Sequence, residues 1–422
     1  MYKNAIRDNY LDFVAYSGHS EFINGLDNCR LCVVIRNIIQ CLMFWRDEWK
    51  IIKEKANKYY NEGRFTTFLA FEWGAGPEMP GGNENSENKW EDVSHINFYY
   101  KDVYPDALEY SPYKIHTYDD IFKVMSEEWD KGHLNIGFPH HPQGKVYWKK
   151  SELAYTTNWT FIANHIKNPD ARDKILRGVE MYSRWGNAIG QYSNLTITWP
   201  YKPNNLYNQT DAWVENAFWE WSENLKGRKF IMQAGSDTHK VSRAGSAKKD
   251  IIGGGNPSGI ISAYAIHNTR DEIWDAMNNC DIFGTQLLKI RANVRFNGQM
   301  ALGKWINCSS PLKINIIAMS TFPGLDSSGR SMCPHNYSIE ELDHPIQDVW
   351  LLKKDRSRGR PWCKVVNHTT PNNNIVVVNF EDADVQPNDF YYIAIRQKGQ
   401  ELKAGENEYM AFIGPVFIEN VI

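Results

Sequence analysis

The stretch Lys229-Phe-Ile-Met-Gln-Ala-Gly-Ser-Asp-Thr-His-Lys240 joins an apolar run to a polar cluster. Residues 229–234 have the length and composition of a buried strand, and Asp237 and His239 follow that run closely. Alternate residues of an extended segment lie on one side, so these two side chains emerge together. Carboxylate and imidazole groups that converge at strand ends are typical of a metal centre on an α/β scaffold.

Several other apolar segments carry a metal-type side chain at or near one end. These are residues 11–16 before His19, residues 66–71 before Glu72, residues 95–100 from His95, residues 134–138 before His140 and His141, and residues 178–183 around Glu180. Taken singly, such a histidine is more often a core or surface residue than a ligand. Their repetition along one chain favours metal binding.

Helical patterns separate these strand-like segments. Residues 31–60 carry apolar side chains at three- and four-residue spacing, which predicts a helix. Further helices are predicted over residues 117–129, 169–177, 212–225 and 270–278. Asp271 and Glu272 after Thr269 form a good helix start. Alternation of this kind predicts βα units around a mostly parallel sheet or barrel, with functional groups at the carboxyl ends of the strands.

The texture of the sequence changes near residue 288. Short strands with turn residues between them are predicted over residues 289–296, 312–319, 347–353, 374–380, 390–396 and 410–413. Several of them alternate apolar and polar residues, and no helical pattern intervenes, which is typical of an antiparallel sandwich. The sequence therefore predicts an α/β domain over residues 1–287 and a smaller β-sandwich domain over residues 288–422.

The overall composition excludes some classes of partner. A formal net charge of −3 over 422 residues gives no footprint for nucleic acid. No apolar run reaches the roughly 18 residues that would cross a membrane. The 16 tryptophans suit an aromatic-rich, carbohydrate-like cleft, and equally a large core. The seven cysteines have no regular spacing, so no disulfide framework is indicated.

The first ten residues do not form a signal peptide. They have the pattern of a helix tail that feeds a strand at once, which predicts that the sequence begins inside a longer chain. Cytoplasmic and exported localisation both stay open.

The order of these segments resembles the PHP (polymerase and histidinol phosphatase) superfamily. The resemblance is carried by Ser17-Gly-His19, Phe71-Glu-Trp73, Ser94-His-Ile-Asn-Phe-Tyr-Tyr100, Pro139-His-His141, Val179-Glu-Met-Tyr-Ser183 and Gly235-Ser-Asp-Thr-His239. Within the superfamily, the chain is most similar to a branch of unknown function in which a β-sandwich follows the PHP barrel. The resemblance implies a distorted (β/α)₇ barrel, divalent zinc, manganese or iron at the strand ends, and hydrolysis of phosphate esters.

The resemblance also implies a set of metal ligands. It places His19 with His239 on one metal, Glu72 as the bridging carboxylate, His95 and His140 on a second metal, and Asp237 on the first metal, with His141 as the alternative to His140.

Two features depart from the family pattern. No His-x-His strand precedes His19, and the family's Thr-Asp-His element is Ser17-Gly-His19 here. A first metal held only by Asp237 and Glu72 would be weakly bound. One explanation is a chain that begins inside the natural protein, which is favoured because a barrel without its first strand has an open edge. The other is a reduced relative, mononuclear or inactive. One to three metal ions are therefore expected.

The ligands predict a metal-dependent hydrolase that attacks a phosphoester through a metal-bound hydroxide. Asp237 and Glu180 are the catalytic candidates, with Glu180 as a proton shuttle or as the partner of a ligand's second ring nitrogen. The substrate is expected to be a small anionic molecule. Its candidate binding residues are Arg184, Lys240 and Arg243, each of which could equally be a solvated surface charge.

Two other functions stay open. A catalytically reduced barrel could act as a binding or accessory protein for glycans or proteins, and the missing His-x-His element would fit this role. A metal-dependent lyase, or a hydrolase of C–O or C–N bonds, could use the same scaffold, because a fold does not fix a function.

Overall fold

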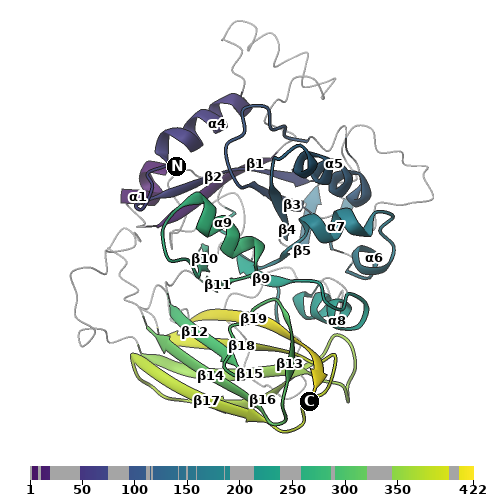
Figure 1. Cartoon of the computed structure of the whole chain (residues 1–422), viewed down its shortest axis with the longest axis vertical. Helices are drawn as coiled ribbons and strands as arrows, with labels where there is room; N and C mark the ends of the chain where they lie inside the picture. Colours follow the sequence, from purple (N-terminus) through teal and green to yellow (C-terminus); the bar gives the residue numbers. More distant parts are fainter. Residues whose placement is uncertain are drawn as a thin grey trace, which may run out of the picture.

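The computed structural model describes residues 2–7, 11–19, 48–74, 95–110, 115, 117–140, 142–148, 151–157, 159–184, 186–190, 213–237, 258–286, 290–320, 345–398 and 408–422. An α/β part lies above a part made of β-sheets, with β9 (Ile231–Ala234), β10 (Gly259–Ala263) and β11 (Ile282–Gln286) between them (Figure 1). Within the described residues, no helix is both long and apolar enough to cross a membrane.

A four-stranded sheet forms the first half of the α/β part, in the order β1-β2-β3-β4. Its elements are α1 (Tyr2–Arg7), β1 (Phe13–His19), α4 (Glu48–Tyr59), β2 (Thr66–Gly74), β3 (His95–Tyr100), α5 (Tyr118–Asp130) and β4 (Asn135–His140). β1 and β2 are parallel, but β3 is antiparallel to both β2 and β4. The expected mostly parallel arrangement is therefore wrong for β3. Antiparallel neighbours need no helical crossover.

The chain then continues through β5 (Gln143–Trp148), β6 (Ser151–Thr156), α6 (Trp159–Asn164), α7 (Pro169–Ile175), β7 (Gly178–Ser183), β8 (Gly186–Asn187), α8 (Val214–Asn224) and β9. β7 is parallel to β9, and a bridge from Gly137 to Leu176 places β4 beside the start of β7. The described strands of this part do not close into a barrel. The fold is mixed α/β, and the predicted (β/α)₇ barrel is not confirmed.

Two sheets face each other in the C-terminal part. Their elements, with α9 (Arg270–Asn278), are β12 (Arg291–Phe296), β13 (Trp305–Cys308), β14 (Leu312–Met319), β15 (Ile346–Lys354), β16 (Cys363–Thr369), β17 (Ile375–Asp382), β18 (Phe390–Lys398) and β19 (Glu408–Val421). One sheet has the order β12-β14-β17, and the other runs β10-β11-β19-β18-β15-β16 with β13 beside β19. Inward-facing residues of both sheets share one apolar core.

The larger of these sheets joins the two parts of the molecule. β10 and β11 precede the predicted domain boundary after residue 287, yet β11 pairs with β19. Glycines allow this sheet to lie close to β9, since a Cβ at Gly284 would be 2.8 Å from the backbone nitrogen of Ala234. The boundary itself stays a prediction, but hydrogen bonding continues across it.

The two faces of the β1–β4 sheet bury different neighbours. Leu69, Phe71 and Phe98 point to one face and share a core with side chains of α4 and α5. Phe68, Ile136 and Phe138 point to the other, inner face and share a core with Ile231 of β9. Side chains alternate along strands, so Glu72, two residues from Ala70 and four from Phe68, also faces inward.

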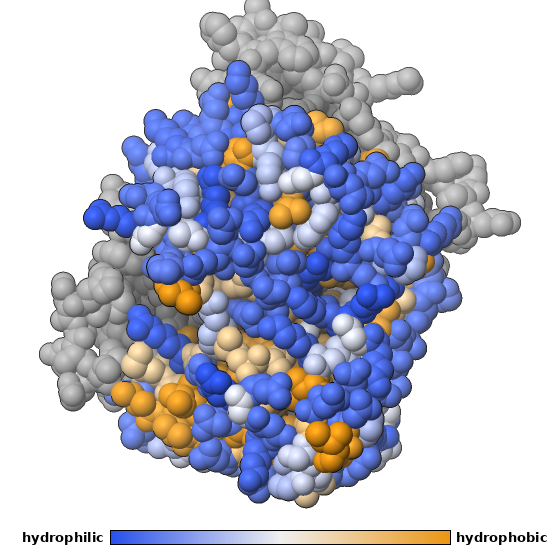
Figure 2. Space-filling view, viewed as in Figure 1, coloured by the Kyte–Doolittle hydropathy of each residue, from blue (hydrophilic) through white to orange (hydrophobic). Residues whose placement is uncertain are grey.

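The visible surface is mostly hydrophilic, with apolar residues gathered over the β-sheet part (Figure 2). Ile317, Ile375 and Val377, on the outward face of β14 and β17, are exposed apolar residues of that part.

Arg270 fixes α9 against the β1–β4 sheet. Its guanidinium donates to the backbone oxygens of Thr67 (2.8 Å) and Ala56 (3.1 Å) and pairs with Asp102 at 2.6 Å. It also lies 4.3 Å from the centre of the Tyr60 ring. A planar fork with several donors fits these acceptors, whereas a single ammonium cannot reach all of them.

We therefore expect Arg270→Lys to lower the free energy of unfolding by about 1–3 kcal/mol, because buried acceptors lose their donors. Chemical denaturation followed by circular dichroism measures the change. Arg291→Lys, at an exposed position of β12, is the control and should shift stability by less than about 0.5 kcal/mol. Equal effects of the two substitutions would show that the contacts of Arg270 are not what holds α9.

Candidate metal centre

Three candidate ligands come together at one end of the strands. Glu72 lies near the end of β2, His140 ends β4, and Asp237 follows β9. One ligand atom from each lies within 4.8 Å of the others. His140 Nε2 is 3.2 Å from Asp237 Oδ2 and 3.8 Å from Glu72 Oε1. Two carboxylates and one imidazole nitrogen are a donor set that fits a divalent metal ion.

The second ring nitrogen of His140 contacts a further carboxylate. His140 Nδ1 donates to Glu180 Oε1 of β7 at 2.8 Å, and both side chains are buried. This hydrogen bond fixes the ring and directs Nε2 towards Asp237 and Glu72. Gly235 leaves room for this carboxylate, because a Cβ there would lie 2.3 Å from Glu180 Oε2. Glu180 therefore has the geometry of a partner that orients a metal-binding histidine.

The cluster has a negative potential. Burial disfavours a charged His140, but the carboxylates of Glu180, Asp237 and Glu72 outweigh burial and raise the pKa of His140 well above its ordinary value. The same carboxylates would attract a divalent cation.

His95 contacts this group through Glu72. It lies opposite His140 across β3 and β4, with the ring centres 6.4 Å apart. His95 Nδ1 donates to Glu72 Oε1 at 2.5 Å. A Cβ at Gly74 would lie 2.8 Å from the His95 ring, so glycine makes room for it. Its predicted role as a ligand of a second metal stays a prediction.

The other predicted ligands are only partly visible. His19 ends β1 directly opposite Glu72 of the parallel strand β2, so its backbone reaches the same end of the sheet, while its side chain lies outside the described part. His141, His239, Lys240 and Arg243 also lie outside the described residues. Their roles stay predictions.

Arg184 is fully buried just beyond β7, and its Nη2 is 3.2 Å from the Ser258 hydroxyl. Of the two interpretations of this residue, a solvated surface charge is therefore excluded. A role in substrate binding stays a prediction.

The sequence profile of one family, described as "Protein of unknown function (DUF3604)", matches residues 11–146 and 206–309, which together are more than half of the chain. The chain belongs to the DUF3604 family. The matched residues include Glu72, His95, His140 and Asp237, whereas Glu180 lies outside them.

No curated protein sequence matches this DUF3604 chain. One similar solved structure is a two-domain protein from Bacteroides vulgatus, described as containing a predicted PHP-like metal-dependent phosphoesterase. It has 10% sequence identity, the match covers 94% of this chain and 83% of that chain, and the TM-score is 0.36. A TM-score at this level does not establish a common fold.

Two polar residues on the inner face of the DUF3604 chain, Asn97 and Tyr99, were not predicted as site residues from the sequence. Asn97 and Tyr99 follow His95 at a spacing of two along β3, and this period could have placed both beside the site. Burial, and then the carboxylates of Glu180 and Glu72, raise the pKa of Tyr99 above its usual range. Tyr99 is thus a neutral phenol near both acids.

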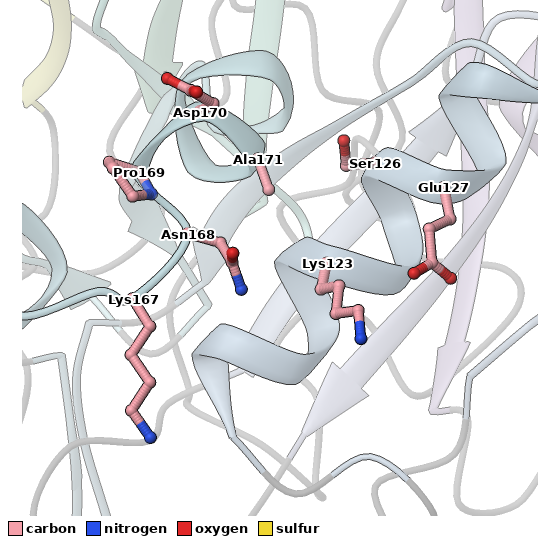
Figure 3. A pocket seen from close by; sticks show the side chains of 8 residues that line it. All are labelled: Lys123, Ser126, Glu127, Lys167, Asn168, Pro169, Asp170 and Ala171. Carbon is pink, nitrogen blue, oxygen red and sulfur yellow. The ribbon is translucent and has the colours of Figure 1, made fainter.

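A hollow of about 370 Å³ lies between α5 and α7. Figure 3 shows its lining, and none of these residues is a candidate ligand: Lys123, Ser126, Glu127, Lys167, Asn168, Pro169, Asp170 and Ala171. Its charged side chains are of both signs, so it gives no indication of a particular ligand.

Asp237 has a left-handed backbone with φ 40°. Asparagine tolerates this conformation, so Asp237→Asn removes the charge and keeps the backbone. We expect the affinity for Mn²⁺ or Zn²⁺, measured by titration calorimetry, to fall at least about tenfold. Asp275→Asn, at an exposed site on α9, should leave the affinity unchanged. Unchanged binding in Asp237→Asn would remove this residue from the centre.

A substitution of Glu180 separates its orienting role from a general effect on the fold. Glu180→Gln should lower metal affinity by about 10–100-fold, because a neutral partner holds the imidazole less firmly and leaves it less basic. Glu128→Gln is the matched control. Glu128 is a buried acid outside the site, and its Oε2 lies 2.8 Å from His133 Nδ1. If both variants bind metal alike, Glu180 has no special part in binding.

Proposed function

We propose that this DUF3604 protein is a metal-dependent hydrolase of the PHP type that cleaves a phosphoester of a small anionic molecule. The observation that carries the proposal is the convergence of Glu72, His140 and Asp237, with His140 held from behind by Glu180. The order of the sequence motifs further supports a PHP-type barrel, of which the described strands would be a part, followed by a β-sandwich.

The residues in and around the centre have different roles. Glu72, His140 and Asp237 would hold zinc, manganese or iron. A divalent ion bound there lowers the pKa of water and offsets charge on a phosphoryl group. Glu180 orients His140 and is also placed to accept a proton. Arg184, a buried cation beyond the same strand as Glu180, is the candidate partner for the substrate anion.

Cysteine chemistry is a poor alternative in the described part of the chain. Burial raises the pKa of Cys280 to about 12 and also raises the pKa values of Cys308 and Cys363. These thiols stay protonated at neutral pH, and only a thiolate is an effective nucleophile. A reaction that uses activated water is therefore favoured.

The proposal predicts hydrolysis of p-nitrophenyl phosphate or bis(p-nitrophenyl) phosphate by the metal-loaded protein. Chelation should abolish activity and added Mn²⁺ or Zn²⁺ should restore it. Asp237→Asn should lower kcat/KM at least about a hundredfold, while Asp275→Asn should retain activity. Release of p-nitrophenol, followed by absorbance, is the measurement.

The result also separates the other functions. Bound metal without hydrolysis of either phosphoester would contradict the proposal and favour a lyase or a hydrolase of another bond. A protein that binds no metal would favour a glycan- or protein-binding role.

A further inference from the structure

The position of Asn97 brings its side chain to the candidate metal centre. Asn97 lies directly opposite Glu72 on β2 and opposite Phe138 on β4. Directly opposed residues have Cβ atoms about 4.5–5.5 Å apart on the same face. His95, two residues earlier on β3, is on this face as well, and it contacts Glu72. Asn97 therefore projects beside the ligand Glu72.

The carboxamide of Asn97 has an unsatisfied atom. The residue is only 6% exposed, and its Oδ1 has no hydrogen-bond partner among the described residues. Buried polar atoms in native proteins are usually paired, and an exception needs an explanation, of which a bound water or ion is one. Ionised Glu72 cannot be the partner, because a carboxylate only accepts hydrogen bonds. A donor or a cation at Asn97 Oδ1 would satisfy this atom.

Among the described residues, apolar side chains lie on one side of Asn97, and Tyr99 is a polar neighbour along β3. Deeper on the inner face, Phe68, Ile136 and Phe138 are buried and apolar. Asn97 thus lies between these apolar side chains and the polar residues of the candidate metal centre. A carboxamide oxygen is a common protein ligand for hard divalent cations.

We propose that Asn97 Oδ1 is a fourth protein donor to the centre of Glu72, His140 and Asp237. This inference rests on the proposed metal centre and extends it. The donor set then contains three oxygens and one nitrogen. Oxygen-rich donor sets suit ions such as Mn²⁺, which take six ligands. Zn²⁺ usually takes four ligands and prefers nitrogen or sulfur donors. The oxygen of Asn97 thus matters more for Mn²⁺ than for Zn²⁺.

The test is Asn97→Leu, which keeps the approximate shape and removes both polar atoms. Titration calorimetry should show Mn²⁺ affinity reduced about tenfold or more and Zn²⁺ affinity reduced less. The thermal midpoint of the metal-free variant should be equal to or above that of the wild type, because an unpaired buried oxygen has been removed. A merely structural asparagine would give the opposite shift in the midpoint.

Asn135→Leu is the matched control. Asn135 is a buried asparagine of the neighbouring strand β4 whose Oδ1 also has no partner among the described residues. It lies opposite Tyr100 on the other face of the sheet, and its Nδ2 donates to the backbone oxygens of Met125 and His133. The substitution should lower the thermal midpoint and leave Mn²⁺ affinity unchanged.

A second measurement needs no variant. Wild-type protein labelled with ¹³C in the asparagine carboxamide should show a hyperfine coupling to bound Mn²⁺ in electron–nuclear double resonance. Absence of this coupling, or equal Mn²⁺ affinity of wild type and Asn97→Leu, would overturn the inference alone. A wild-type protein that binds neither Mn²⁺ nor Zn²⁺ would overturn both the proposed centre and the inference.

Discussion

The imidazole of His140 faces carboxylates from three segments of the chain. The strands of the α/β part bring these segments together. Glu72 comes from β2, Glu180 from β7, and Asp237 follows β9. Gathering several negative charges in a buried place is costly unless a positive partner balances them. Protonated His140 supplies one charge at most. The strand arrangement thus favours binding of a cation. In the sequence the same acids and histidines are scattered, so their convergence could not be read from it directly.

Close approach between strands is the second constraint on the site. Gly74 and Gly235 leave space for His95 and Glu180, and Gly259 brings β10 against the segment that precedes Asp237. The backbone nitrogen of Gly259 donates to Gly235 at 2.9 Å. Because β10 belongs to the sheet that continues into the β-sandwich, the C-terminal part buttresses the segment carrying Asp237. The C-terminal sheets therefore support the position of this segment.

Local pattern in the sequence predicted the elements better than their partners. Residues 312–319, 95–100 and 178–183 are strands with the expected bounds, and α9 begins after Thr269. The periods of two and 3.6 are local properties, so they survive without tertiary information. Strand pairing is not local, which is why the reversed direction of β3 and the pairing of β11 with β19 were missed. The antiparallel pair β5–β6 was also not predicted.

The same distinction holds within the site, where a residue type can be read but its partner cannot. His140 of the doubled histidine lies beside Glu72 and Asp237, while His141 lies outside the described residues. The three candidate ligands differ in exposure to solvent. Glu72 and His140 are buried, whereas Asp237 is partly exposed. Among the described ligands, Asp237 is therefore the one nearest to solvent. The proposed hydrolysis needs a metal with an open position for water or substrate, and the greater exposure of Asp237 would put that position on its side of the centre.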